Sequence, residues 1–251
     1  MEEKVEKKEV KKSKKKVIIT VVVILVLILL VAGGFIFYHG NQTGKLIAEV
    51  NKLSEIQMTN ADGTLVEEPI DMKIKTTGSY AVVEETFKNY MNEIVTDTQA
   101  LVDALDQEKI MNLVSIDNMK EDGPDFINSK EEITTMRDAI SNYVAKMESL
   151  ANEETLLSRI DDKDIGEYYK ELYRQLATNE ESGVSLKDAI DDLKTNEEEA
   201  VQALNDLESI FNFLSDNKAE WQIEDGQIVF ITQSAYDEYI NLMTSLETIE
   251  W

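Results

Sequence analysis

The chain has 251 residues, 43% of them hydrophobic, with a net charge of −25, one histidine and no cysteine. This composition excludes disulfides and the clusters of Cys and His that bind zinc. The strong negative charge also argues against nucleic acid as a partner, because it would repel the phosphates.

Charge is distributed unevenly along the chain. Residues 1–16 hold eight lysines and four glutamates, a net charge of +4, whereas the rest holds 17 basic and 46 acidic residues, a net charge of −29. An apolar run at residues 17–38 separates the two parts. We therefore divide the chain into a basic tail, an apolar run and a large acidic region.

The apolar run predicts a membrane-spanning helix. Its 22 residues carry no charge, and about 20 apolar residues suffice to cross a bilayer. The alternative, a cleaved signal peptide, would have a shorter apolar region of about 7–15 residues. We therefore predict an uncleaved signal anchor in the lipid bilayer. It includes Val17, Ile24, Leu30, Phe37 and Tyr38.

The basic tail predicts the orientation of this anchor. Lysines directly precede the apolar run, which is the signal that keeps a flanking segment in the cytoplasm. We expect the N-terminus inside the cell and more than 200 residues outside it. The lysines closest to the membrane are Lys11, Lys12, Lys14, Lys15 and Lys16.

Amino-acid usage favours a bacterial source. Lysine exceeds arginine by 22 to 3, which indicates an AT-rich genome. The predicted exterior lacks cysteine although disulfides could persist there. Together these features favour the cell membrane of a Gram-positive bacterium.

A helix and a linker are predicted between the membrane and the main domain, at residues 39–78. Leu46, Val50 and Leu53 recur at helical spacing and predict a short juxtamembrane helix. Turn-forming residues then dominate residues 59–79 and predict a linker. Its apolar part, Leu65–Ile74, is expected to pack as a short extended segment.

Residues 79–251 predict an acidic helical bundle. Apolar residues at spacings of three and four predict successive helices. Their expected ranges are about 79–115, 129–157, 165–176, 186–214 and 234–251. The fold class is therefore predominantly all-α, with an antiparallel bundle of four or five helices. The alternative is an intermolecular coiled coil, in which the same apolar seams would join a homodimer.

Serine residues at three positions predict helix starts. Ser129 with Glu132 forms a capping box, in which two side chains bind the free backbone N–H groups of the first turn. Ser185 opens a second such pattern with Asp188. Ser234 is expected to cap the last helix.

One segment departs from the helical pattern. Asp225-Gly226 is typical of a two-residue turn in a β-hairpin. A hairpin at about 221–231 would place four apolar side chains on one face. They are Trp221, Ile223, Ile228 and Phe230. We expect this face to pack on the bundle or to bind a partner, and the Leu65–Ile74 segment is a candidate third strand.

Catalytic and metal-binding motifs are missing from the sequence. The calcium-loop pattern fails at each Asp-rich turn; in the loop from Asp162, for example, Tyr173 occupies the position of the required Glu. Two short motifs of penicillin-interacting enzymes coincide at residues 215–218, but those enzymes need them at separate places. The sequence also lacks the glycine-rich phosphate-binding motifs. We predict no enzyme activity, no metal and no cofactor.

The sequence therefore favours a function in binding. The first hypothesis is a protein-interaction or scaffold module of the cell envelope, with another envelope protein as its partner. The second is an extracytoplasmic ligand-sensing bundle that works with a separate membrane partner. Its candidate pocket is formed by Tyr168, Tyr169 and Tyr173, for which core packing is the alternative.

Overall fold

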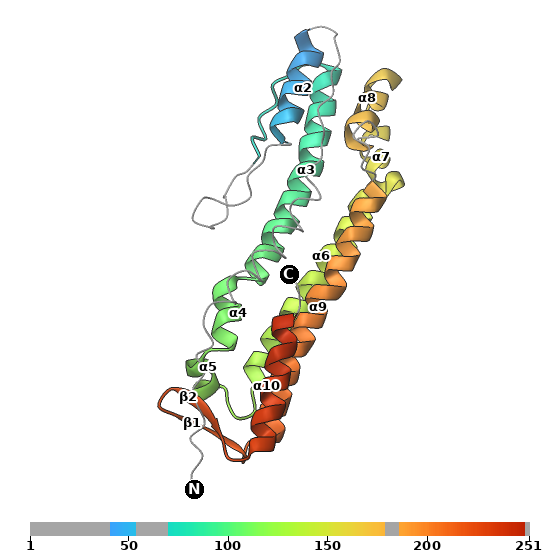
Figure 1. Cartoon of the computed structure of the whole chain (residues 1–251). Coiled ribbons are helices and arrows are strands. Elements are labelled where there is room, and N and C mark those ends of the chain that lie inside the picture. The colour runs from blue at the N-terminus through green and yellow to red at the C-terminus, as the bar shows by residue number, and fades with distance from the viewer. Residues whose placement is uncertain (1–40, 54–69, 179–185, 249–251) are drawn as a thin grey trace.

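The computed structural model describes residues 41–53, 70–178 and 186–248 (Figure 1). They are predominantly helical, with a two-stranded antiparallel sheet near the C-terminus, which confirms the predicted fold class at this level. The predicted membrane anchor and the lysines before it lie outside the described residues. Within those residues, every helix is too short or too polar to cross a bilayer.

The described elements follow one another in a simple order. They are α2 (Asn41–Leu53), α3 (Ser79–Ala104), α4 (Gln107–Leu113), α5 (Ile116–Glu121), α6 (Ile127–Ala151), α7 (Glu153–Asp161), α8 (Glu167–Thr178), α9 (Leu186–Asp216), β1 (Trp221–Glu224), β2 (Gln227–Phe230) and α10 (Gln233–Thr248).

These elements form an elongated molecule. The long helices α6 and α9 run side by side in opposite directions, α3 packs on α6, and α10 packs on α9 (Figure 1). At one end α2 packs on α3, and α7 and α8 also contact α3. The hairpin lies at the opposite end, next to α10. Long helices therefore join two different ends of the molecule. Helices α2, α7 and α8 lie at one end, and the hairpin lies at the other.

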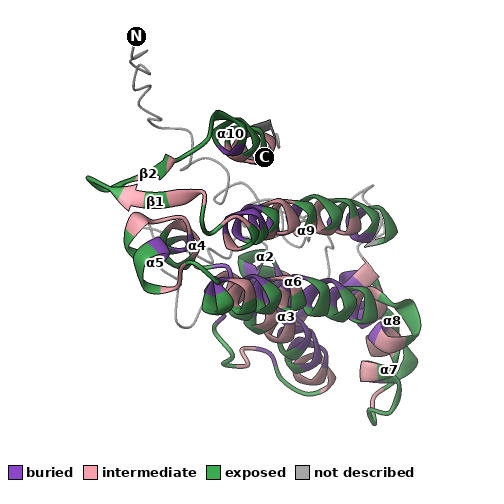
Figure 2. Ribbon diagram, turned by 90° about the horizontal axis from the view of Figure 1, so that it is seen from below, coloured by how far each residue is buried: buried purple, intermediate pink, exposed green. Residues whose placement is uncertain are grey.

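Apolar side chains fill the space between these helices. Figure 2 shows buried residues along the long helices α3, α6 and α9. The core includes Val83, Phe87, Ile94, Ile133, Met136, Ile140, Met147, Leu193, Leu204, Phe211 and Leu214. From Ile190 onward, the apolar seam predicted for residues 186–214 is thus buried within a single chain.

Two of the predicted helices are interrupted by polar side chains that start a new helix. The helix expected over residues 79–115 ends at Ala104, because the Asp106 carboxylate accepts hydrogen bonds from the N–H groups of Glu108 and Lys109 and caps α4. The helix expected to reach residue 157 ends at Ala151, where the Asn152 side chain caps α7. The apolar periodicity continues through both breaks, so it could not reveal them.

Two of the predicted caps are wrong. Helix α6 begins before Ser129, and its N-terminus is held by Asp122, whose Oδ2 accepts hydrogen bonds of 2.7 Å from both the N–H and the Oγ of Ser129. Helix α10 begins before Ser234, and Thr232 Oγ1 accepts a hydrogen bond from the N–H of Ala235. The predicted cap at Ser185 lies outside the described residues.

The hairpin has the predicted register. Trp221 pairs with Phe230, and Ile223 pairs with Ile228. The turn residues Asp225 and Gly226 have φ values of 49° and 75°, as a two-residue turn of this type requires. Residues 70–74 lie outside the sheet, which has only two strands in the part of the chain that the structure describes. The third strand considered for this segment is therefore wrong for residues 70–74.

Two glycine-to-alanine substitutions should change the free energy of unfolding in opposite directions and so test this backbone geometry. Gly226→Ala should lower the free energy of unfolding by about 1–2 kcal/mol, because its positive φ strains any side chain. Gly44→Ala should raise it by about 0.5–1 kcal/mol, because Gly44 lies in helix α2. Neither new methyl group meets an atom within 4 Å. Urea unfolding of the detergent-solubilised chain measures both, and changes of the same sign would contradict this geometry.

Candidate functional site

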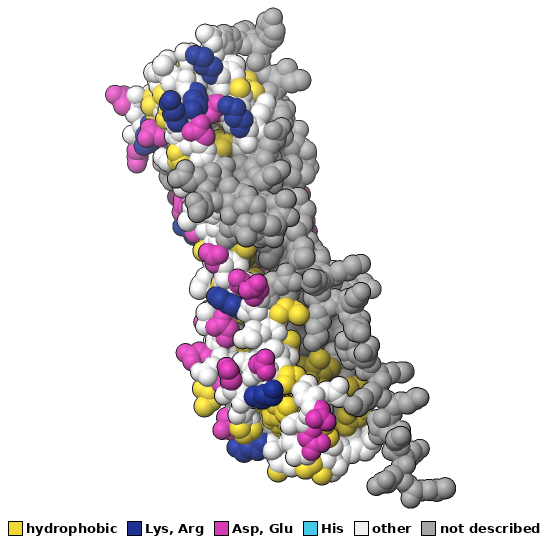
Figure 3. Space-filling view, turned by 90° about the vertical axis from the view of Figure 1, so that its left-hand side faces the viewer, with side chains coloured by type: hydrophobic (Ala, Val, Ile, Leu, Met, Phe, Trp, Pro, Cys, Tyr) yellow, Lys and Arg dark blue, Asp and Glu magenta, His cyan; other side chains and the backbone are white. Residues whose placement is uncertain are grey.

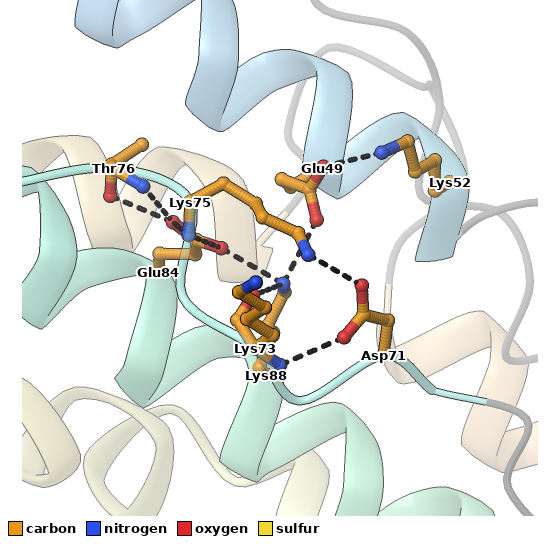
Figure 4. Close-up of polar contacts among 8 residues, drawn as sticks. All are labelled: Glu49, Lys52, Asp71, Lys73, Lys75, Thr76, Glu84 and Lys88. Atoms are coloured by element: carbon orange, nitrogen blue, oxygen red, sulfur yellow. Dashed lines mark hydrogen bonds and ion pairs between the residues drawn. The ribbon is translucent and has the colours of Figure 1, made fainter.

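The buried lysine Lys88 lies where α2, α3 and residues 70–78 meet. Its side chain is 1% exposed, and Nζ lies 2.9 Å from Glu49 Oε2 on α2 and 2.8 Å from Glu84 Oε1 on α3 (Figure 4). Lys88 Nζ also donates a 2.9 Å hydrogen bond to the backbone carbonyl of Lys73. We call Lys88, Glu49 and Glu84 the charge clasp, and residues 70–78 the strap.

Each charge of the clasp has several partners. Glu84 and Lys88 are four residues apart on α3 and therefore lie on the same face. Glu84 Oε2 accepts hydrogen bonds from the N–H and the Oγ1 of Thr76, at 2.8 and 2.7 Å. Glu49 also pairs with Lys52 at the surface. Buried charges are tolerated when they are paired and hydrogen-bonded in this way, so the clasp is a complete polar network.

Further contacts hold α2 and the strap on α3. Thr43 Oγ1 on α2 donates a 2.9 Å hydrogen bond to Tyr80 Oη on α3. In the strap, Ile70 is buried in the core, and the N–H of Thr77 donates to the side chain of Gln42 on α2. Helix α2 therefore forms one unit with the strap and α3, which follow it later in the sequence.

The clasp shifts the pKa values of all three groups toward their charged forms. Burial alone would raise the pKa of Glu84, but hydrogen bonds from Lys88 and Thr76 outweigh it and lower the pKa below 4.5. Burial would likewise raise the pKa of Glu49, and Lys52 and Lys88 lower it. The pKa of Lys88 rises above 10.5, because the two carboxylates outweigh its own burial. All three groups are charged at neutral pH.

A second polar cluster joins α3 to α6 and α7. The Glu93 carboxylate binds Lys146 on α6 and, at 2.7 Å, Nη2 of Arg159 on α7. The Arg159 guanidinium lies over the ring of Tyr90, 5.3 Å from its centre. Burial raises the pKa of Asp97, one turn further along α3. The ion-paired side chains of this second cluster are more exposed than those of the clasp, and the two clusters share no residue.

The three tyrosines of the predicted pocket lie on α8 and differ in how deeply they are buried. Tyr168 is 58% exposed, and its ring contacts that of Tyr169, which in turn contacts Tyr80. Tyr173 is fully buried, and its hydroxyl has no hydrogen-bond partner among the described residues. The first two rings thus come together at the surface, while the third belongs to the core.

The predicted apolar face of the hairpin packs on the bundle. The indole N–H of Trp221 donates a 2.7 Å hydrogen bond to the carbonyl of Leu214, and its ring stacks on Phe126. Phe230 contacts the rings of Phe213 and Tyr239. Ile223 and Ile228 are partly buried against the same core. The face is therefore a packing surface in the single chain.

The charge clasp was not among the sites predicted from the sequence. The available signal was a pair of opposite charges, Glu84 and Lys88, each next to a core residue of the apolar stripe, Val83 and Phe87. Such pairs are usually solvated on a helix surface. Glu84 and Lys88 are buried only because α2 and the strap pack over them.

Comparison of the chain with protein-family models, curated proteins and solved structures found no match. Among the described residues, no three acidic or histidine side chains come close enough together to hold a metal ion. The function must therefore be inferred from the geometry of this chain alone.

Removing the buried lysine should strongly destabilise the protein. Lys88→Met leaves two buried carboxylates without their partner, and we expect a loss of about 3–5 kcal/mol in the free energy of unfolding. The matched control is Lys146→Met, which breaks an ion pair at a lysine that is 44% exposed and should cost less than about 1 kcal/mol. Urea unfolding compares the two, and equal losses would contradict a special role of the clasp.

Acid should reduce the difference between the wild-type protein and Lys88→Met. A carboxylate whose pKa is lowered on folding stabilises the protein above its unfolded pKa, and this contribution is lost as pH falls through the folded pKa. For Glu49 and Glu84 the unfolded value is about 4.5. In Lys88→Met the lysine no longer offsets the burial that raises these pKa values, so the difference in unfolding free energy between the two proteins should begin to shrink above pH 4.5 and continue to shrink below it. A pH-independent difference would contradict the assignment.

Proposed function

We propose that the chain is a single-pass membrane-anchored protein of the cell envelope. Its extracytoplasmic helical bundle is non-catalytic and serves as a protein-interaction or scaffold module. The proposal rests on the predicted anchor and its basic flank, and the observation that carries it is the charge clasp. The clasp fixes α2, the described helix nearest to the apolar run in sequence, on the main bundle.

A rigid connection suits a scaffold. A bundle that only had to be tethered would need no more than a flexible linker after its anchor. Here α2, the strap and α3 are instead held by a buried network of charges and hydrogen bonds. Helix α2, which follows the predicted anchor in sequence, is thereby held in a fixed relation to the bundle.

The electrostatics of the clasp carboxylates and of Glu93 favour ion pairing over catalysis, whereas Asp97 is a carboxylate whose pKa burial raises. A general acid needs a raised pKa, which burial or a neighbouring negative charge provides. The pKa values of Glu49, Glu84 and Glu93 are instead lowered by lysine and arginine partners. Such groups act as fixed charges in ion pairs and do not donate protons at neutral pH.

Ligand sensing is the second candidate, and one observation favours it. Tyr173 Oη and Arg159 Nε are buried without hydrogen-bond partners among the described residues. Both belong to the end of the bundle where α7 and α8 pack on α3. A small polar ligand could satisfy both groups, which would make this junction its binding site.

Membrane topology provides the direct test of the proposed function. Because the chain has no cysteine, single substitutions report on one position each. Gln222→Cys, at an exposed position of the hairpin, should react in intact cells with a maleimide that cannot cross membranes. Ser13→Cys, in the basic tail, is the matched control and should react only after permeabilisation. The reverse pattern, or labelling of both in intact cells, would contradict the proposed topology.

A further inference from the structure

Apolar side chains are exposed at the end of the molecule opposite to the clasp. Val229 and Ile231 at the end of the hairpin are 36% and 67% exposed, and Tyr236 and Ile240 on α10 are 41% and 38% exposed. We call these four residues the terminal surface. In Figure 3, hydrophobic side chains gather at the lower end of the molecule, where Figure 1 shows the hairpin.

The local geometry explains why these residues are exposed. Side chains alternate along a strand, so Val229 points away from the face on which Phe230 packs. Ile231 follows the end of β2 and is exposed. On α10, Ala235 and Tyr239 pack on the core, while Tyr236 and Ile240 lie one residue further round the helix. The ring of Tyr236 contacts that of Phe230, so the hairpin and the start of α10 pack on each other at this end.

The C-terminal segment that carries this surface has charges of one sign. Residues 219–251 contain seven acidic residues and no lysine, arginine or histidine. The exposed acidic residues of the hairpin and of the start of α10 are Glu224, Asp225, Asp237 and Glu238. An apolar surface with an acidic border is complementary to apolar side chains flanked by basic ones.

We propose that the terminal surface binds a basic amphipathic segment of a partner protein, with lysine or arginine flanking its apolar side chains. The inference rests on the proposed function as an interaction module and specifies the partner of that module. A second copy of the chain is a poor occupant, because it would bring acidic borders together in a molecule whose net charge is −25.

The surface is preorganised for such a partner. The Trp221 indole bonded to Leu214 and the ring contacts of Phe230 fix the hairpin on α9 and α10. A surface that is rigid before binding loses little conformational entropy when it binds. Binding should therefore depend on side chains of the terminal surface and on salt concentration, and not on folding of the hairpin.

A peptide-binding experiment tests the proposal. The full chain is placed in phosphatidylcholine nanodiscs, with empty nanodiscs as the blank. The probe is a fluorescent amphipathic helix of leucine and lysine, and its leucine and glutamate counterpart is the control peptide. We expect the basic peptide to bind and the acidic one not to bind. Ile231→Ser/Ile240→Ser should weaken binding about tenfold or more, because two apolar contacts are lost.

Matched variants distinguish a specific surface from general attraction to an acidic protein. Met72→Ser changes an apolar side chain of similar exposure, 39%, in the strap, and should leave binding unchanged. Asp237→Asn/Glu238→Gln should weaken binding, whereas Asp162→Asn/Asp164→Asn, in an exposed turn distant in sequence, should weaken it less. Equal effects of the two charge pairs, or no effect of Ile231→Ser/Ile240→Ser, would overturn the proposal.

Photo-crosslinking in cells separates failure of this inference from failure of the proposed function. A photoreactive residue is placed at Ile240 in the terminal surface and, as a control, at the exposed position of Tyr168 on α8. A crosslink at Ile240 to a basic segment of another protein supports the inference. A crosslink to another protein only at Tyr168 overturns the inference but leaves the interaction module standing. A crosslink at Ile240 to a second copy of the chain also overturns it, and no crosslink at either position counts against both.

Discussion

The buried charge of Lys88 is the constraint on which the arrangement of this protein depends. An ammonium group removed from water is costly, so its position is tolerated only while both carboxylates and the Lys73 carbonyl stay in place. Because these partners come from α2, the strap and α3, none of the three segments can move without breaking the network. Apolar packing of α2 alone would be less specific, since apolar contacts lack direction.

The clasp lies at one of two ends of the molecule that differ in structure. At one end, it connects the bundle to α2, which follows the predicted membrane anchor in sequence. At the other end, the hairpin and α10 expose an apolar surface with an acidic border. The long helices α6 and α9 keep these ends apart (Figure 1). The proposed scaffold function follows from this division into an attached end and a binding end.

The sequence was sufficient for the long helices and the hairpin, because their signals are local, but the short helices α4, α5 and α7 were not predicted as separate elements. Apolar periodicity found the helices, and Asp225-Gly226 determined the register of the hairpin. Helix boundaries were less certain, because Asp106 and Asn152 start new helices without interrupting the apolar pattern. The clasp could not be predicted, since the burial of Lys88 depends on contacts with a glutamate 39 residues away in sequence. The anchor remains a prediction from the sequence.

A distance measurement between α2 and α3 tests the central claim that the clasp makes them one rigid unit. Spin labels are attached to Ala48→Cys on α2 and Asn89→Cys on α3, both exposed positions in a chain without native cysteine. Double electron–electron resonance on the full chain in nanodiscs should give one narrow distance distribution, which broadens when Lys88→Met is added. A broad distribution in the otherwise unaltered chain, or one that is insensitive to the loss of Lys88, would contradict the account.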